Sequence, residues 1–271
     1  PLTLTRYSAP EAIVGAVSSA SDWWSLGMIV LEQITRGDCF LDSNEKAFLI
    51  HVVTRGVELP DNLPQEFENL LRGLLAKDPL ERWQQDEVSR WLSGEKIEAP
   101  QLSIYQDVDL GDGIKLGELE FFSPERFSLA AAEASKWEEA ESLLVTGELV
   151  TWLEEHQYDS SKLTLVKRIN GREDVESKYK FALVLMVLND ALPLTQRGEI
   201  VTPSWITRTD NEGFELIFGP VSELLAEMSR ETWLVSLKGR GEKVLDRARI
   251  LEIDLDDFLY RQFSIVTSRA K

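Results

Sequence analysis

The sequence has little cysteine and histidine, and it lacks both a long apolar run and an excess of positive charge. Its single cysteine, Cys39, excludes a disulfide within the chain and gives no sign of an oxidising compartment. His51 and His156 are far apart and no cysteine cluster accompanies them, so we expect no structural zinc site. Apolar runs such as 181–188 fall far short of the roughly 20 residues that cross a bilayer.

The charge balance argues against a polyanionic partner. Lysine and arginine number 29 and aspartate and glutamate 47, which gives a net charge of −18. Such a field repels phosphate backbones and anionic lipid surfaces, and no run of basic residues offers a local patch. We therefore expect no nucleic-acid partner. The short apolar runs and the single cysteine add the expectation of no membrane span in this chain and a cytoplasmic location.

The composition predicts a folded protein of two domains. The chain has 271 residues, of which 43% are hydrophobic and 28% charged, as in globular proteins. A polar stretch with a proline, residues 93–101, is the preferred boundary. We predict a first domain at 1–95, a linker at 96–103 and a second domain at 104–271.

The first domain is predicted to be helical. The segment that starts at Asp22 is apolar almost all round, which predicts a helix buried on most faces and closed by Gly37 as its C-cap. A short helix is expected to begin near Pro10. Further helices are predicted at 43–54, 65–76 and 86–92.

The second domain is predicted to be mostly helical with one short β-hairpin. Alternating residues at 104–108 and 114–122 predict a hairpin around Gly111-Asp112-Gly113. Loops are expected at 193–203 and 209–213, and Gly239-Arg240-Gly241 predicts a turn. Helices are predicted near 124–144, 147–156, 160–169, 177–189, 221–229, 232–237, 242–250 and 256–265.

Four short motifs follow one another in the first hundred residues. They are Tyr7-Ser8-Ala9-Pro10-Glu11, Asp22-Trp23-Trp24-Ser25-Leu26-Gly27, Gly37-Asp38-Cys39-Phe40, and the stretch from Leu70-Leu71 to Lys77-Asp78-Pro79-Leu80-Glu81-Arg82. In this order they resemble the C-lobe of a eukaryotic-like (bacterial) serine/threonine protein kinase, from the substrate loop with its APE motif to the domain end. Cys39 replaces the proline that the family has there.

The resemblance implies structural roles for four residues. The APE glutamate of the family, here Glu11, forms a buried ion pair with a late arginine, here Arg82. The family's central-helix aspartate, here Asp22, holds the catalytic loop, and Trp24 belongs to the same motif. Without the resemblance, Asp22 is an ordinary N-cap candidate that competes with Ser21.

The substrate loop is the least regular part of the resemblance. The family usually has threonine seven residues before the APE glutamate, but Leu4 stands there in this chain. Thr3 and Thr5 flank it, so either a one-residue shift restores the role or the loop is unusual. We take Thr3, Thr5 and Tyr7 as the candidate substrate-loop residues.

The motifs that carry catalysis in this family are missing. Phosphate transfer in protein kinases needs a glycine-rich loop, a strand lysine, a catalytic aspartate and a magnesium-binding aspartate, and no H-R-D, D-F-G or V-A-I-K occurs here. Asp107, Asp109 and Glu118 are spaced as in a calcium loop, but Asp112 stands where glycine is required. We expect no catalytic residue, cofactor or metal in this chain. ATP and magnesium are expected for a longer parent kinase.

Residues 104–271 faintly resemble the helical extensions of some bacterial serine/threonine kinases. The segments that prompt this are 88–94, 137–140 and 147–153, with Trp83. Trp137 and its helically spaced neighbours predict core packing, with an exposed partner groove as the alternative. The expected partner is a protein substrate or a regulatory protein. Two functions stay open: part of a serine/threonine kinase, or a non-catalytic, pseudokinase-like scaffold.

Overall fold

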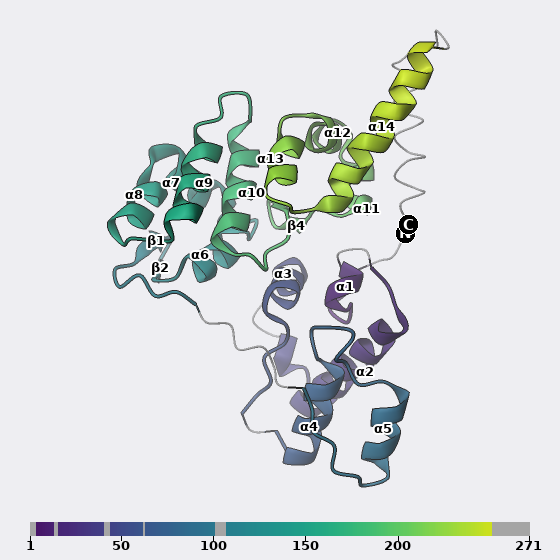
Figure 1. The fold of residues 1–271 in the computed structure, drawn as a ribbon. Coiled ribbons are helices and arrows are strands. Elements are labelled where there is room, and N and C mark those ends of the chain that lie inside the picture. The colour runs from purple at the N-terminus through teal and green to yellow at the C-terminus, as the bar shows by residue number, and fades with distance from the viewer. Residues whose placement is uncertain (1–3, 14–15, 41–43, 62, 101–106, 251–271) are drawn as a thin grey trace. The chain divides into compact units, whose positions relative to one another are not determined.

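The structure of the chain is a computed structural model that describes residues 4–13, 16–40, 44–61, 63–100 and 107–250. The chain divides into two compact units, Pro1–Asp109 and Leu110–Lys271. Helices dominate the described residues and the strands form two short hairpins, which confirms the mainly helical fold class (Figure 1). The predicted linker at 96–103 stays a prediction, because residues 101–106 lie outside the described residues. The helix expected at 256–265 also lies outside them.

The first unit is a small helical assembly. Helix α2 packs against α4, and α1 packs against α3. Its elements are α1 (Pro10–Ile13), α2 (Ser19–Thr35), the 3₁₀ helix η1 (Asp38–Phe40), α3 (Glu45–Arg55), α4 (Gln65–Leu74) and α5 (Gln85–Leu92). The helices predicted from the sequence at 43–54, 65–76 and 86–92 are thus present, with small shifts at their ends.

Helix α2 begins earlier and ends slightly earlier than expected. Its N-cap is Ser18, in an extended conformation, and the Ser18 N–H donates to the Ser21 hydroxyl at 3.2 Å. At the other end Arg36 takes the left-handed conformation with φ 54°, so Gly37 follows the C-cap instead of forming it. Asp22 lies in the first turn, where its negative charge favours the helix dipole, and it is not the N-cap.

The prediction that this helix is buried on most faces is wrong for the described residues. Trp24, Met28 and Leu31 are fully buried, but Leu26 and Ile29 are 39% and 47% exposed. The two elements that pack most closely on α2, namely α4 and η1, leave this face of the helix uncovered. An apolar sequence all round a helix therefore does not guarantee burial all round it.

The first hairpin of the second unit does not turn where the sequence predicts. Of the first predicted strand, 104–108, residues 104–106 lie outside the described residues and 107–108 form no strand. Strands β1 (Ile114–Leu116) and β2 (Leu119–Phe121) are antiparallel, with Leu116 opposite Leu119. The turn is therefore Gly117-Glu118, not Gly111-Asp112-Gly113. Gly117 has φ +61°, which glycine adopts easily at the first central position of a type II′ turn.

Five helices form the centre of the second unit. They are α6 (Pro124–Ala131), α7 (Trp137–Thr146), α8 (Glu148–Glu155), α9 (Ser160–Asn170) and α10 (Ser177–Leu188). Helix α10 packs against α6, α7 and α9, and its residues from Phe181 to Leu188 are all buried. Trp137 and Trp152 are also buried, which confirms core packing for these tryptophans.

The single helix predicted at 124–144 is wrong, because the chain turns between α6 and α7. The Glu133 N–H bonds to the Ala130 carbonyl and the Lys136 N–H to the Glu133 carbonyl, which are tight turn contacts. The tip of a second hairpin packs here, against Ala134. The break thus coincides with a contact from a distant part of the chain, and no glycine or proline of the sequence lies at it.

This second hairpin occupies part of the loop predicted at 193–203. Strand β3 (Thr195–Gln196) pairs with β4 (Glu199–Ile200), and the turn residues Arg197 and Gly198 have φ 46° and 83°. Two consecutive left-handed residues make a type I′ turn. A Cβ on Gly198 would lie 2.8 Å from the Ala134 nitrogen, so the close approach requires glycine.

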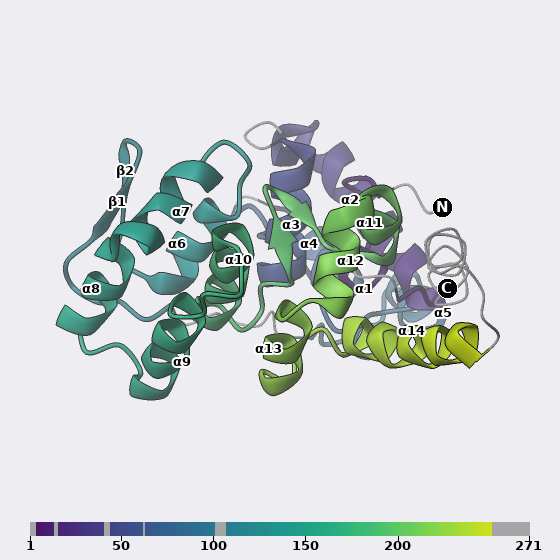
Figure 2. The same cartoon turned by 90° about the horizontal axis from the view of Figure 1, so that it is seen from above.

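The last part of the second unit is a group of four helices. Helix α12 packs on α11, α13 and α14. They are α11 (Pro203–Arg208), α12 (Asp210–Phe218), α13 (Val221–Glu227) and α14 (Thr232–Ile250). The loop expected at 209–213 is wrong, because those residues start α12, and the helices expected at 232–237 and 242–250 are one continuous helix. Figure 2 shows α14 running away from α13.

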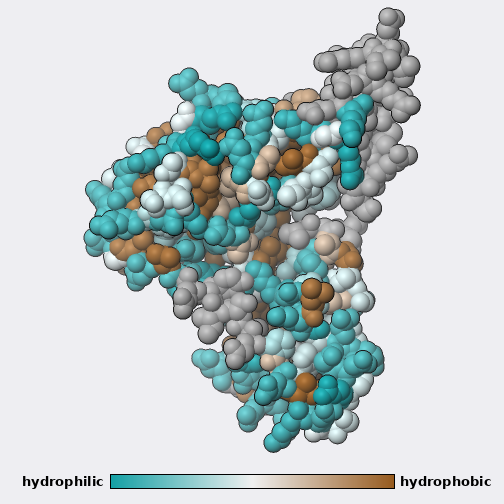
Figure 3. All heavy atoms as spheres, viewed as in Figure 1, coloured by the Kyte–Doolittle hydropathy of each residue, from teal (hydrophilic) through white to brown (hydrophobic). Residues whose placement is uncertain are grey.

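Among the described residues, no helix is both long enough and apolar enough to span a membrane. Their surface is mainly hydrophilic with scattered apolar patches on the face shown in Figure 3.

Candidate functional site

The structure brings Glu11 and Arg82 together. Glu11 lies in α1, whose helix begins at Pro10, and Arg82 follows the turn after α4. The two terminal guanidinium nitrogens donate to the two carboxylate oxygens at 2.7 and 3.0 Å, a bidentate pair. The Arg82 side chain is fully buried and that of Glu11 is 12% exposed. We call this pair and its hydrogen-bond partners the clamp.

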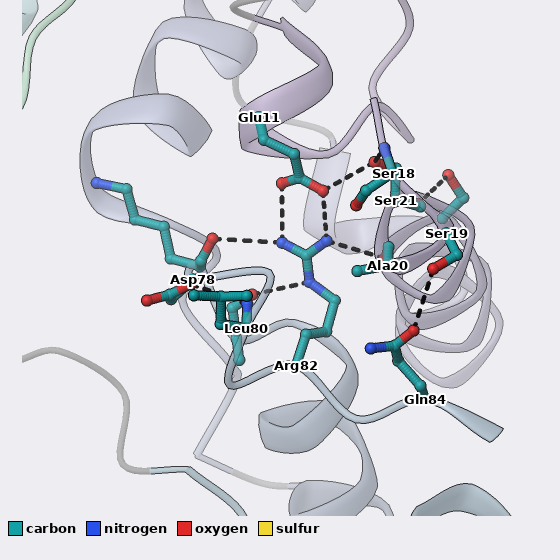
Figure 4. A network of polar contacts seen from close by, with 12 residues as sticks. Glu11, Ser18, Ser19, Ala20, Ser21, Asp78, Leu80, Arg82 and Gln84 are labelled. Atoms are coloured by element: carbon teal, nitrogen blue, oxygen red, sulfur yellow. Dashed lines mark hydrogen bonds and ion pairs between the residues drawn. The ribbon is translucent and has the colours of Figure 1, made fainter. Parts of the chain in front are cut away.

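The arginine also binds three backbone carbonyls. Its Nε donates to the Ala76 carbonyl at 2.9 Å, and its terminal nitrogens donate to the carbonyls of Ala20 at 2.9 Å and Lys77 at 3.3 Å. These contacts and the pair with Glu11 use all five N–H donors of the guanidinium. Figure 4 shows the side chain joining α1, the start of α2 and the turn after α4.

The Glu11 carboxylate is held in its ionised form. Burial raises its pKa, but hydrogen bonds from Arg82, from its own backbone and from the Ser21 hydroxyl outweigh burial and leave the pKa below its ordinary value. The Ser21 hydroxyl donates to the carboxylate at 2.9 Å. Ser21 therefore links the N-cap of α2 to the clamp.

Trp24 and Asp22 have different surroundings although both come from one motif. Trp24 is fully buried, and the Arg82 guanidinium carbon lies 5.0 Å from the centre of its ring, within cation–π range. Within the described residues the Trp24 indole N–H has no hydrogen-bond partner. Asp22 is exposed on α2, on the same side as Leu26 and Ile29.

The substrate-loop candidates meet the other end of α2. The Tyr7 hydroxyl donates to the Glu32 carboxylate at 2.9 Å, and this hydrogen bond is the main cause that raises the tyrosine pKa. The Ser25 hydroxyl donates to the Tyr7 carbonyl at 3.0 Å. The Thr5 hydroxyl accepts a long 3.4 Å hydrogen bond from the Tyr7 N–H, while Thr3 lies outside the described residues.

Sequence reasoning missed three residues of this site. Ser21, Ser25 and Glu32 lie on α2 at spacings of four and seven, which places them on one helix face. That spacing is visible in the sequence, but its contact with the loop before α1 is not. The face of α2 that carries these residues holds both the loop and the clamp glutamate.

The clamp is a positioning device and not a reacting centre. A guanidinium and an ionised carboxylate that are fully hydrogen-bonded to each other supply neither a free nucleophile nor a free base. In the part of the chain that the structure describes, no three or more histidine, cysteine, aspartate and glutamate side chains gather as a metal site would require. The arrangement fixes residues 4–13 on α2 and on the turn after α4.

Comparison with known proteins shows what the first unit is similar to. Residues 3–91 match the family model described as Protein kinase domain. The Arabidopsis thaliana Serine/threonine-protein kinase AtPK2/AtPK19 is 39% identical over 79 residues, 29% of this chain and 17% of that protein. The Drosophila melanogaster RAC serine/threonine-protein kinase is 35% identical over 78 residues, 28% of this chain and 13% of that protein. No solved structure matches the chain.

The chain therefore spans less than a fifth of the length of these relatives. The first unit is similar to the C-terminal portion of a serine/threonine protein kinase domain, whereas the family match ends at residue 91 and does not reach the second unit. The two relatives are eukaryotic, and the faint resemblance of the second half to bacterial kinases stays a prediction.

Proposed function

We propose that the chain is part of a serine/threonine protein kinase. Its first unit supplies the substrate-side part of the C-lobe, and its second unit is a regulatory or interaction domain. The parent protein transfers the γ-phosphate of ATP, with magnesium, to a protein serine or threonine in the cytoplasm, while this chain contributes no catalytic, ATP-binding or metal-binding residue. Its partners are the protein substrate and a regulatory protein.

The observation that carries the proposal is the clamp. Its two charged members, Glu11 and Arg82, are the residues that the resemblance pairs, and 70 residues of chain separate them. Burial of a guanidinium costs desolvation free energy, and apolar residues of similar size often stabilise a protein as well or better, so we interpret the clamp as a device that holds residues 4–13 in place. In a protein kinase that loop binds the substrate.

The exposed face of α2 supports the same proposal. Leu26 and Ile29 are large apolar side chains on a helix whose opposite face is buried, and Asp22 extends the exposed face toward the helix start. In the kinase fold the catalytic loop is held by the residue that Asp22 matches. We propose that the remaining kinase residues pack on this face.

The test is a phosphate-transfer assay on the protein as its own gene encodes it, with a protein serine/threonine substrate. We expect transfer that depends on ATP and magnesium, and Arg82→Ala should reduce it at least tenfold. Arg82→Lys is the matched control, because it keeps the charge but loses the two parallel hydrogen bonds, and it should restore little activity. Absence of transfer in the unmodified protein would favour the non-catalytic scaffold.

A further inference from the structure

The segment that follows α5 lies back on the first unit as an extended strap. Residues 95–100 form neither helix nor strand, and exposure alternates over 96–99. Lys96 and Glu98 are exposed, whereas Ile97 and Ala99 are partly buried. This period of two is typical of an extended chain with one face on an apolar surface. We call residues 95–100 the latch.

Beneath the latch is an apolar cluster drawn from α2, α4, α5 and the turn between the last two. Ile97 and Ala99 pack against this cluster. Its buried members are Leu70, Leu74 and Trp83, and its partly buried members include Trp23, Val30, Val88 and Trp91. Three tryptophans therefore lie in or around a surface that a short strap covers, and we call this set the tryptophan cluster.

Few polar contacts hold the latch. The Asn69 side-chain amide, on α4, donates to the Ile97 carbonyl at 2.7 Å. At the start of the latch Arg90 pairs with Glu95, but both side chains are about half exposed, so this ion pair adds little. Beyond Glu95, the Asn69 hydrogen bond and the apolar packing of Ile97 and Ala99 keep the latch on the cluster.

We propose that residues 95–100 are a releasable latch that opens without unfolding the first unit. Docked, the latch covers the buried part of the tryptophan cluster and holds the chain that leaves α5 against α4. Released, it uncovers the apolar surface of Leu70, Leu74 and Trp83 on which Ile97 and Ala99 pack. The ion pair between Arg55 and Asp107 still holds the chain to the first unit beyond the latch. This inference does not depend on kinase activity.

The sequence provides a direct probe at the exposed Lys96. Trypsin binds several residues on each side of the bond that it cleaves, so we expect cleavage after Lys96 to require that the latch leave the surface. When opening and closing are faster than cleavage, the cleavage rate follows the fraction of open molecules. Asn69→Ala removes the hydrogen bond to Ile97, and we expect cleavage of the full chain after Lys96 to be about tenfold faster. Gln65→Ala is the control: it lies one turn earlier on α4, is exposed, and should leave the rate unchanged.

A second variant tests the apolar half of the contact. Ala99→Asp places a carboxylate against the tryptophan cluster and should speed cleavage more than tenfold, whereas Glu98→Asp, on the exposed face, should not. In each case mass spectrometry should find the fragments 1–96 and 97–271. Equal cleavage rates in Asn69→Ala, Ala99→Asp and their controls would overturn the proposal. So would a cleavage rate with the same urea dependence as the unfolding of α4, because the latch would then open only with the whole unit.

Discussion

Helices α2 and α10 are the most apolar helices of their units, yet they are enclosed to very different degrees. In α10 every residue from Phe181 to Leu188 is buried, because α6, α7, α9 and β3 pack around it. In α2 the buried residues Trp24, Met28 and Leu31 share the helix with Leu26 and Ile29, which are exposed. Two helices that are both rich in apolar residues thus differ in burial: α10 is enclosed in the core of the second unit, whereas α2 keeps one face exposed in the first.

The difference in burial indicates which unit has an apolar helix that is not fully covered. An apolar helix loses about 25 cal/mol of stabilisation for each Å² of apolar surface that stays in water, so an uncovered stripe of large side chains is a feature to explain. The second unit needs no further partner for its central helix. The open face of α2 supports our proposal that more kinase residues belong on the first unit.

The largest effect is expected from breaking the clamp. Arg82→Ala leaves the Glu11 carboxylate and three backbone carbonyls without their donor, which should destabilise the first unit by about 3–5 kcal/mol. Native-state hydrogen exchange measures this, with peptides of the second unit as the internal control. A loss below about 1 kcal/mol would mean that the clamp does not hold the unit together.

A pair of substitutions tests the comparison of the two helices. Leu185→Ala, in the enclosed helix, should cost about 2–5 kcal/mol because it leaves a cavity. Leu26→Ala, on the open face of α2, should cost only about 1 kcal/mol in this chain, because part of this side chain is already in water. Hydrogen exchange measured at increasing urea concentrations gives the unfolding free energy of each unit separately. Similar losses for both leucines would contradict the difference that we describe.

A smaller effect is expected at the second hairpin. Gly198→Ala combines a left-handed backbone with a Cβ too close to the Ala134 nitrogen, and should destabilise the second unit by about 1–3 kcal/mol. Gly111→Ala is the matched control, since Gly111 also has a positive φ but open space around it. It should cost only about 1 kcal/mol. If the two variants lose the same stability, the close contact between the hairpin tip and Ala134 adds nothing to the cost of the substitution.

The smallest effect concerns pH. Because the pKa of Glu11 is lowered on folding, its ionised form stabilises the first unit above the ordinary value of 4.5, and this stabilisation is lost as the pH falls through the lower folded pKa. Glu11→Gln should therefore flatten the acid side of the stability curve of the first unit. Exchange rates measured between pH 3 and about 6 check this. An unchanged acid slope would show that Glu11 is not responsible.

The sequence predicts the members of the clamp but not the rest of the site. Glu11 and Arg82 are identified by resemblance to kinase motifs, since 70 residues of chain separate them and no local pattern links them. The contact of Tyr7 with Glu32 is missed for the same reason: the spacing on α2 predicts a shared face, but not which loop lies on it. The alternative role for Asp22, an N-cap, fails because Ser18 caps the helix.

The helices of the fold are easier to predict than their breaks. Helices α9 and α10 lie close to the predicted 160–169 and 177–189, because periodicity and local capping define them. The turn between α6 and α7 lies against the tip of a hairpin more than 60 residues later. Helix α14 continues through Gly239 and Gly241, where the sequence predicts a turn. Local signals cannot report packing partners that are distant in sequence.

The most direct test of the central claim is to place Leu26→Asp in two contexts and measure the stability of the first unit in each. In this 271-residue chain the side chain is 39% exposed, and we predict a loss of only about 1 kcal/mol, from the lower helix propensity of aspartate and its repulsion by Asp22 one turn earlier. In the protein as its gene encodes it, with the remaining kinase residues packed on α2, we predict a loss of more than about 3 kcal/mol. The same small loss of stability in both contexts would contradict the claim that the rest of a kinase lobe packs on the open face of α2.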